Sequence, residues 1–455
     1  KTYTRHLLRE SYRANGKVLH RTIANVSHCS TAEIAALRLA LRYKEDLEHL
    51  GSLQDAITLK QGVSFGAVWT VYHIARRLGI EKALGTTREG KLALWQVIAR
   101  VIDQGSRLSA VRLAMSHAAC DVLGIDAFDE DALYENLDWL AGAQARIEDR
   151  LFVQRTKTTP VSLFLYDVTS SYLEGTHNAL AAFGYNRDGK KGKRQIVIGL
   201  LCDEDGHPVS IEVFPGNTQD PQTFARQLTK VKARFGVHEI TFVGDRGMIK
   251  GQQIEDLAQQ GLHYITAITK PQIEKLLRTG TLQMDLFDQE LAEVLADEGI
   301  RYVLRRNPVR AQEVRDTRHA KLATLQTQVA KKNQYLTDHP RAKVQGAVQK
   351  LVASAQKLRI ADWVELTVKE RSITLAINED AQTEAAKLDG CYVLKTDLTP
   401  SQANKEIVHD RYKDLASVEQ AFRTCKTAHL EVRPIFLRRE ARTRAHAFVV
   451  MLAYQ

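Results

Sequence analysis

The chain has 455 residues, 44% of them hydrophobic and 26% charged, which are the proportions of a soluble globular protein. This length predicts two to four domains. No run of 18 apolar residues is present, and the first residues, KTYTRHLLRE, lack the apolar core of a secretory signal, so neither a membrane span nor export is expected. Both ends, Lys1 and the apolar run FVVMLAYQ, are expected to be incomplete.

The charge balance favours a polyanionic partner. Lys and Arg number 64 against 54 Asp and Glu, which gives a net charge of +10 and a pI near 9.2. Such a surplus promotes contacts with phosphates, although many enzymes that never touch nucleic acid are equally basic. The cysteines form no C-x-x-C pair, so neither a disulfide framework nor a zinc site is expected, and a cytoplasmic location fits. These cysteines are Cys29, Cys120, Cys202, Cys391 and Cys425.

Residues 1–155 are predicted to form a mainly helical N-terminal region. Near its start, Asn15-Gly16 is a signal for a hairpin turn between two strands. From residue 31 onward, apolar residues recur every three or four positions, with Ser, Asp and Gly at the breaks. The basic helices of this region are candidates for DNA binding, and packing in a helical core is the alternative for any one of them.

The pattern changes to strands after Pro160. Segments rich in Val, Ile and aromatic residues follow one another, and helical patterns separate the last of them. This order predicts an α/β fold, a mixed sheet with helices packed on it. The five segments are VSLFLYDV, RQIVIGLLCD, PVSIEVFPG, EITFVGD and LHYITAIT. Residues 156–275 are predicted to be the first part of this sheet domain.

Residues 276–385 are predicted to be an insertion subdomain within the sheet domain. Residues 309–358 are highly charged and read as a long helical hairpin with Asp-His-Pro near its bend. The segment WVELTVKERSITLAIN follows and predicts two strands. Residues 386–455 are predicted to be the last part of the sheet domain, with one more strand, CYVLKTDL, and a helical end.

Asp167 stands in an unusual place, at what the sequence predicts to be the end of the apolar strand SLFLYD. A buried and unpaired carboxylate is costly, so such a residue is usually neutralised, hydrogen-bonded or bound to a metal ion. A turn capped through the following Thr and Ser residues is the alternative. Asp245 ends the run EITFVGD in the same way, and Glu419 lies in a helical stretch free of Gly and Pro.

Three such carboxylates can hold a pair of Mg²⁺ ions, since this hard cation prefers oxygen ligands. Two ions about 4 Å apart would hold the attacking and leaving oxygens of a phosphodiester displacement. Tyr412, Glu419 and Lys426 follow one another at seven-residue spacing, so they share one face of a continuous helix with a drift of only about 20° per step. A solvated helix face with a chance heptad is the alternative.

These residues resemble those of the DDE transposases of bacterial insertion sequences, in the branch with an insertion before the glutamate. That branch carries a signature of Tyr, two residues, Arg, three residues, Glu, six residues, Lys. Here Tyr412, Glu419 and Lys426 match it, but Leu415 stands at the Arg position, so one expected phosphate contact is in doubt. Arg411 and Arg423 are possible substitutes outside that spacing. The segments YDVTSSYLEG, GYNRDGKKGKRQIVIGLL, FVGDRGMI, LDGCYVLKTDL and EVRPIFLRREARTRAHAFVVMLA also look like blocks of the family.

The resemblance implies a ribonuclease H-like catalytic domain with Asp167, Asp245 and Glu419 as catalytic residues and metal ligands. It implies two Mg²⁺ ions, with Mn²⁺ as a substitute. The implied partners are double-stranded DNA, both the terminal inverted repeats and the target, bound by a homodimer on paired ends. The implied reaction is hydrolysis at the element's ends and attack of the freed 3′-hydroxyl on target DNA, without a covalent protein–DNA intermediate. The expected location is the bacterial cytoplasm, at the nucleoid.

Other residues are candidates for DNA contact or for metal binding. The candidates for DNA contact are Tyr412, Lys426, Arg423, Arg246 and, in the basic loop 186–195, Lys190, Lys191, Lys193 and Arg194. An exposed turn is the alternative for this loop, and an ion pair is the alternative for Arg246. Asp203 and Asp205 fit a turn, and His446 fits a helical core. Asp188 and Glu174 are reserve metal ligands.

Two other functions remain open from the sequence. One is a ribonuclease H-like nuclease that cuts DNA without joining strands. The other is a transposase remnant that binds DNA without catalysis.

Overall fold

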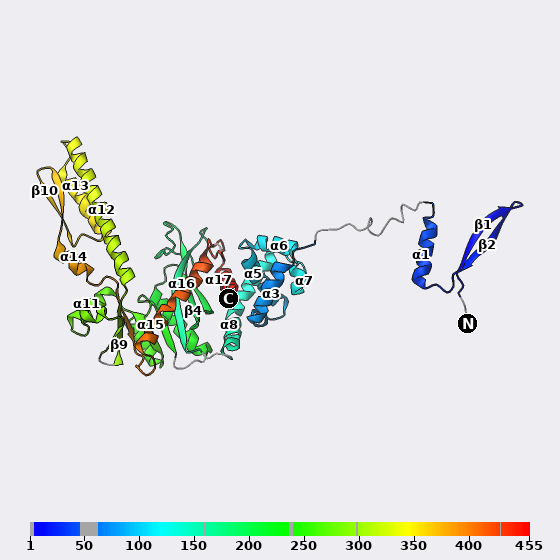
Figure 1. Ribbon diagram of the computed structural model, residues 1–455, viewed down its shortest axis with the longest axis horizontal. Coiled ribbons are helices and arrows are strands. Elements are labelled where there is room, and N and C mark those ends of the chain that lie inside the picture. Colours follow the sequence, from blue (N-terminus) through cyan, green and yellow to red (C-terminus); the bar gives the residue numbers. More distant parts are fainter. Residues whose placement is uncertain (1–3, 46–61, 158–160, 236–239, 297–298, 428) are drawn as a thin grey trace. The chain divides into compact units, whose positions relative to one another are not determined.

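The computed structural model describes residues 4–45, 62–157, 161–235, 240–296, 299–427 and 429–455 (Figure 1). The chain divides into two compact units, residues 1–63 and 64–455. Within the described residues, no helix combines the length and the apolar character needed to cross a membrane.

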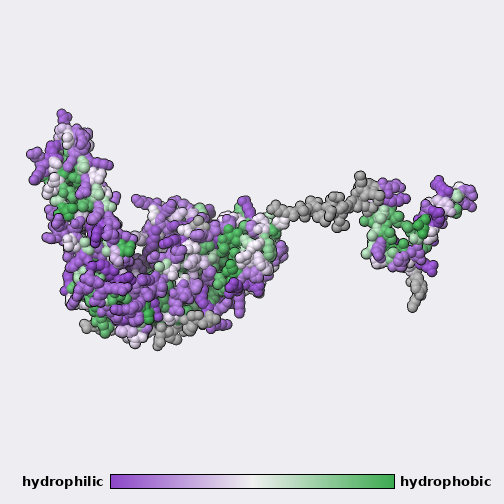
Figure 2. Space-filling view, viewed as in Figure 1, coloured by the Kyte–Doolittle hydropathy of each residue, from purple (hydrophilic) through white to green (hydrophobic). Residues whose placement is uncertain are grey.

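In the described residues of the first unit, a β-hairpin is followed by helix α1 (Thr31–Arg42). Strands β1 (Leu7–Ala14) and β2 (Lys17–Asn25) pair antiparallel through the turn at Asn15-Gly16, as predicted. Both turn residues have positive φ, at 50° and 69°, which is the backbone that a tight hairpin turn needs. Helix α1 begins at a capping box between Ser30 and Glu33. Figure 2 shows apolar side chains at the surface of this unit.

The second unit begins with a helical layer. Helix α5 (Arg88–Ile102) is buried from Leu92 to Arg100, and it packs against α8 (Glu130–Thr156) and the C-terminal helix α17 (Glu440–Tyr454). The shorter helices around them are α3 (Gly66–Arg77), α4 (Ile80–Leu84), α6 (Arg107–Ser116) and α7 (Ala119–Leu123). This part confirms the expectation of a mainly helical N-terminal region.

The centre of the second unit is an eight-stranded mixed sheet in the order β5-β4-β3-β6-β7-β12-β9-β8. Three antiparallel strands come first in the chain, and β6 and β7 then run parallel to β3, so the first five strands have the ribonuclease H-like arrangement. The predicted strands are β3 (Leu163–Tyr172), β4 (Gln195–Cys202), β5 (Pro208–Pro215), β6 (Thr241–Gly244), β7 (His263–Ala267) and β12 (Cys391–Thr396).

Helices cover both faces of this sheet. Along β3, Leu163 and Leu165 face one hydrophobic cluster while Phe164 and Tyr166 face the other, as the alternation of a strand buried on both sides requires. The second cluster includes residues of α9 (Asp220–Lys230), the π-helical turn Val231–Phe235 and α10 (Gly251–Gln259). Helices α15 (Lys405–Lys413) and α16 (Leu415–Lys426) follow β12.

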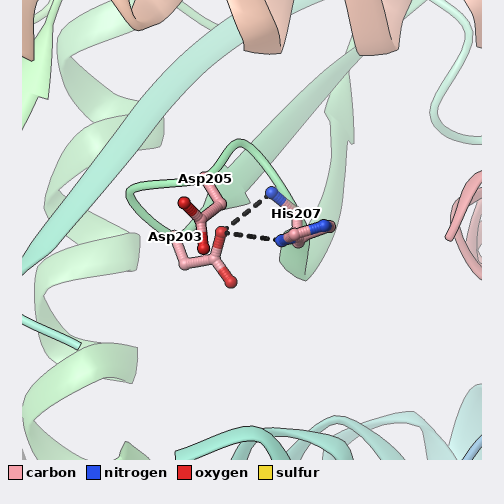
Figure 3. A group of neighbouring side chains, drawn as sticks. All are labelled: Asp203, Asp205 and His207. Atoms are coloured by element: carbon pink, nitrogen blue, oxygen red, sulfur yellow. Dashed lines mark hydrogen bonds and ion pairs between the residues drawn. The ribbon is translucent and has the colours of Figure 1, made fainter. Parts of the chain in front are cut away.

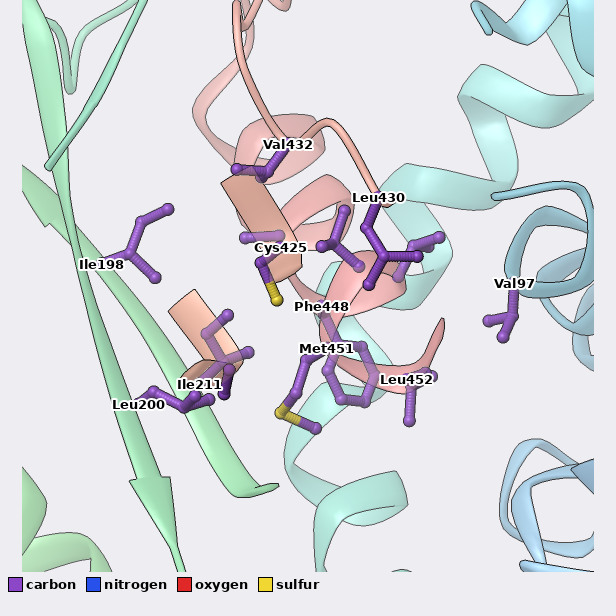
Figure 4. Close-up of a cluster of buried hydrophobic side chains, with 14 of the residues drawn as sticks. Val97, Ile198, Leu200, Ile211, Cys425, Leu430, Val432, Phe448, Met451 and Leu452 are labelled. Carbon is purple, nitrogen blue, oxygen red and sulfur yellow. The ribbon is translucent and has the colours of Figure 1, made fainter. Parts of the chain in front are cut away.

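The first hydrophobic cluster joins the sheet to the C-terminal helices. Figure 4 shows Cys425 of α16 and Phe448 and Met451 of α17 in one cluster with Ile198 of β4 and Ile211 of β5. The same cluster contains residues of α5 and α8, so the helical layer and the sheet share one core. The division therefore falls at residues 63/64, whereas the sequence places a boundary at 155/156.

The inserted part is smaller than the expected 276–385. Helix α11 (Lys270–Arg278) and the 3₁₀ turn Met284–Asp288 lead into β8 (Ala292–Leu295) and β9 (Arg301–Arg306), which extend the main sheet. The projecting part is a helical hairpin, a two-stranded sheet and a short helix, with a hydrophobic cluster of its own. Its elements are α12 (Pro308–Asp338), α13 (Val344–Leu358), β10 (Val364–Lys369), β11 (Ser372–Ile377) and α14 (Glu379–Ala386).

Candidate active site

Asp167 and Asp245 lie where two parallel strands separate. The pairing of β3 with β6 ends at Tyr166 and Gly244, so Asp167 is the next residue on β3 and Asp245 is the first residue after β6. Asp167 is not at a strand end, because β3 continues to Tyr172 and remains paired with β4. The turn alternative is therefore wrong. Asp245 is followed by a turn at Arg246-Gly247, as the sequence suggests.

Glu419 of α16 lines the same cavity as the two aspartates. This cavity has a volume of about 360 Å³. Its polar side chains are Asp167, Asp245, Glu419, Asp220, Arg187, Arg423, Lys426 and Thr169. Asp220 is already paired, since both its oxygens accept hydrogen bonds from Arg187, at 2.7 and 2.8 Å. Three carboxylates distant in sequence therefore share one cavity without forming an ion pair with any described side chain.

The carboxylates of this cavity influence one another. Asp167 is half-buried, and burial raises its pKa to about 7, with the nearby charges of Asp245 and Glu419 adding to the effect. The backbone N–H of Val168 donates to Asp167 at 2.7 Å and opposes this rise in pKa. Carboxylate oxygens without an ion-pair partner are the ligands that a hard divalent ion such as Mg²⁺ prefers. The three side chains therefore supply the type of ligand that a divalent metal ion takes, although among the described residues only Asp203, Asp205 and His207 bring three such ligand atoms within 4.8 Å of one another.

Tyr412 and Lys426 lie on either side of Glu419, but not on one unbroken helix. The predicted helix is interrupted at Asp414, which separates α15 from α16. The Tyr412 hydroxyl still lies 3.4 Å from Asp245 Oδ1 and donates to it. Burial and the charge of Asp245 raise the pKa of this phenol, so it remains protonated and able to donate.

Lys426 belongs to a buried ion-pair network beside the cavity. Its ammonium donates to Asp188 at 2.9 Å and to Thr169 Oγ1 at 2.5 Å. Asp188, whose side chain is only 1% exposed, also pairs with Arg433 and accepts the backbone N–H of Tyr172 at 3.1 Å. Asp188 is thus occupied as an ion-pair partner and does not line the cavity, in contrast to the reserve ligand expected.

The basic loop 186–195 divides into exposed and paired residues. Lys191 and Lys190 are exposed, and the Lys190 ammonium lies over the ring of Tyr172. Lys193 pairs with the other reserve ligand, Glu174, at 2.7 Å. Arg194 donates to the carbonyl of Thr176 at 3.2 Å. None of these four residues lines the carboxylate cavity.

Two of the remaining arginine candidates are exposed near the carboxylates. Arg423 lines the cavity from α16, one turn beyond Glu419. Arg246 is exposed, and its backbone N–H donates to Asp245 at 2.8 Å. Leu415, at the signature's Arg position, is buried in the first hydrophobic cluster.

A second group of possible metal ligands lies in the turn between β4 and β5 (Figure 3). Asp203 there is buried and already paired with Arg155 at 2.9 Å, and it accepts the backbone N–H of His207 at 2.8 Å. Asp205 and His207 are exposed. Asp203 thus stabilises the turn, as the sequence suggests. His446 likewise lies buried in α17, where it contacts Arg107 and the carbonyl of Val432.

The comparison with protein families decides the identity. A family described as "Transposase DDE domain" matches residues 159–455, well over half of the chain. The chain belongs to the DDE transposases of insertion sequences. A second family, described as "IS1634 family transposase, N-terminal domain", matches residues 1–53 of this transposase. Members of the DDE family use divalent metal ions, which agrees with the donor set in the cavity.

Solved structures of transposases are similar to this chain at low identity. A piggyBac transposase synaptic complex with hairpin DNA is 9% identical with a TM-score of 0.40, and the match covers 79% of this chain and 63% of that one. A Mos1 transposase paired-end complex with the left transposon end is 9% identical with a TM-score of 0.18, covering 40% of this chain and 58% of that one. This transposase thus spans less than two thirds of the length of either. No protein in the curated set matches it.

Sequence reasoning missed three partners of this transposase's site. Asp220 was visible only as a helix start, because Asp-Pro is a common N-terminal signal. Arg187 and Arg433 lie in irregular segments without periodicity, so no local signal indicated that they pair with Asp220 and Asp188.

Proposed function

We propose that this protein is the active transposase of a bacterial insertion sequence. It binds the terminal inverted repeats, hydrolyses the DNA at the element's ends and joins the freed 3′-hydroxyl to target DNA. The observation that supports this most is the single cavity shared by Asp167, Asp245 and Glu419, where β3 and β6 separate next to α16. The excess of positive charge on the chain suits a DNA partner.

In this proposal the three carboxylates hold two Mg²⁺ ions, with Mn²⁺ as a substitute. When bound, such ions activate the attacking oxygen and stabilise the leaving oxygen of a phosphodiester displacement. Tyr412 donates to Asp245 and so fixes the orientation of that carboxylate. Arg423, exposed at the cavity, contacts a DNA phosphate, which makes it the substitute for the arginine that the signature lacks.

In the proposed site Lys426 first has a structural role, whereas its position in the signature suggests direct contact with DNA. Because its ammonium bonds to Asp188 and Thr169, it first fixes the end of α16 against β3. A phosphate that enters the cavity would meet Lys426 already oriented by Asp188. The other basic candidates do not line this cavity, and in this proposal they contact the DNA along its backbone: Lys190, Lys191, Lys193, Arg194 and Arg246.

The test uses the full-length protein, a DNA fragment with the flanking inverted repeat, and Mg²⁺. We expect wild type to cut at the repeat boundary and Glu419→Gln, which keeps the size but removes the charge, to bind and not cut. The matched control is Asp205→Asn, which removes a carboxylate of the β4–β5 turn and should cut like wild type.

Other results would change the proposal. Equal cutting by wild type and Glu419→Gln would exclude Glu419 as a ligand. Binding without any cutting by wild type would indicate a DNA-binding remnant. Cut ends that never appear in joined products, when target DNA is present, would indicate a nuclease. A dimer on paired ends would appear as a complex that holds two DNA fragments.

A further inference from the structure

Another cavity, of about 220 Å³ and with both polar and apolar side chains in its lining, lies where the link between α5 and α6 meets residues 431–437. Two arginines and the first residues of α6 form one side of it. The charged or polar side chains that matter here are Arg100, Ser106, Arg107, Glu431, Arg433 and His446. Nothing in the proposed chemistry of the carboxylate cavity uses this second cavity.

The two arginines are buried without an acidic partner. Arg100 is 5% exposed and Arg107 is 7% exposed. Arg100 donates to the carbonyls of Gln104 at 2.6 Å and Gly105 at 3.3 Å, and Arg107 lies 3.2 Å from His446 Nδ1. The Nε–H of each arginine has no hydrogen-bond partner. Neither guanidinium forms an ion pair with a carboxylate of the described residues.

The guanidinium groups of Arg100 and Arg107 therefore concentrate positive charge in the buried lining of this cavity. Burial and the charge of Arg100 lower the pKa of Arg107 to about 9. Burial holds the pKa of His446 well below its usual value, so this histidine stays neutral and supplies no compensating charge. Asp103 and, to a smaller extent, the exposed Glu431 act on Arg100 from a distance, without an ion pair among the described atoms. An arginine buried without an anion is rare, because the desolvation cost is not offset.

The start of α6 adds to this positive field. Ser106 caps the helix by accepting the backbone N–H of Ser109 at 3.1 Å, and Ser106 itself is exposed in the cavity. The first N–H groups of a helix have no partner within the helix and carry the positive end of its dipole. Helix starts of this kind bind phosphates when other donors converge on them.

We propose that this cavity binds a phosphate group of the DNA backbone, held by Arg100, Arg107 and the start of α6. The inference rests on the proposed function, because it takes DNA as the source of the phosphate. Arg433 connects the two places, since it lines this cavity and also pairs with Asp188 next to the carboxylate cavity. The site thus gives the DNA a second point of attachment besides the catalytic centre.

The test changes Ser106, because an arginine variant could simply fail to fold. Ser106→Asp keeps a good N-cap and brings a negative charge to the two arginines, so it should fold well and exclude a phosphate. Ser106→Asn is the matched control, with nearly the same shape, an equally good cap and no charge. We expect Ser106→Asp to bind the inverted-repeat DNA about tenfold more weakly than Ser106→Asn. The slope of log K against log salt should become smaller by about 0.9, the value for one lost phosphate contact.

A second measurement separates DNA from free phosphate as the ligand. Inorganic phosphate should raise the melting temperature of wild type and Ser106→Asn, but not that of Ser106→Asp. If phosphate does so while both variants bind DNA equally, the site holds a free phosphate and the assignment to DNA is wrong. If both variants match wild type in both measurements, the arginines are purely structural. If wild type binds no DNA, the proposed function fails, and the phosphate measurement still tests the cavity.

Discussion

At the scale of single residues, the buried charges around the active site are the features that local sequence does not reveal. Asp188 resembles an ordinary turn residue in the basic loop, yet its side chain is 1% exposed and binds Lys426, Arg433 and a backbone N–H. Asp167, Asp245 and Glu419 show the opposite pattern, since none of them forms an ion pair with a described side chain although all three line one cavity. Charges that bind each other stabilise the fold, and charges left unpaired are available for a ligand.

Asp188→Asn should therefore lower the free energy of unfolding by about 3 kcal/mol, because it leaves Lys426 and Arg433 without their anion in a buried place. Urea unfolding followed by circular dichroism measures this. The control is Glu313→Gln, which breaks an exposed pair with Arg310 on α12 and should cost about 0.5 kcal/mol or less. Equal losses for the two variants would show that the Asp188 network contributes no more than a surface pair.

At the scale of elements, the position of α16 determines where Glu419 lies. The turn between β4 and β5 contacts this helix through Gly206, which has a φ of 79°. A Cβ atom at Gly206 would lie 2.5 Å from the Cβ of Ser417, two residues before Glu419. The hairpin and the helix can approach this closely only because residue 206 has no side chain.

Gly206→Ala should thus both strain the β4–β5 turn and displace helix α16. The matched control is Gly261→Ala, which has a similar φ of 69° but open space around its Cβ position. The control should lose about 1 kcal/mol of stability from its backbone alone. Gly206→Ala should lose more than this and should also cut DNA more slowly, as urea unfolding and a cleavage assay would measure. If the two variants behave alike, the contact with Ser417 does not position α16.

The elements also show what the sequence could and could not predict. The strands β3 to β7 and β12 were predictable because each is a compact run of β-branched and aromatic residues. The end of β3 was placed too early, because Thr169 and Ser170 resemble turn residues. In the structure their hydroxyls are buried and accept hydrogen bonds from Lys426 and the backbone of Arg187. Those partners lie far along the chain or in a loop, where periodicity gives no information.

At the scale of the whole molecule, the chain divides between residues 63 and 64, a boundary that the sequence pattern does not indicate. The helical layer of residues 64–157 shares its core with the sheet, and Glu148 of α8 accepts hydrogen bonds from Ser210 and Ile211 of β5. The sequence shows a change of pattern near Pro160, but a change from helix to strand does not mark a domain boundary. Shared burial determines which residues form one unit, and only the tertiary structure reveals it.

Two truncations test this division. A protein that begins at Ser64 should keep the melting temperature of the full chain, because the core of the second unit is built from its own residues. A protein that begins at residue 156 should fail to fold, because it exposes the faces of α17 and the sheet that α5 and α8 cover. Calorimetry of both measures this, and a cooperative transition in the shorter protein would place the boundary at 155/156 after all.

The place where the projecting helical hairpin leaves the sheet has one more consequence. Strands β9 and β12 are antiparallel neighbours, with Arg306 opposite Cys391, and the N–H of Asn307 donates to the carbonyl of Gly390 at 2.8 Å. The whole projection thus occupies the position of an ordinary hairpin loop. Since the entropy of closing a loop rises only slowly with its length, this loop could lengthen or shorten during evolution without altering the sheet that carries the carboxylates. The length of the projection can therefore change without a change in the arrangement of the carboxylates.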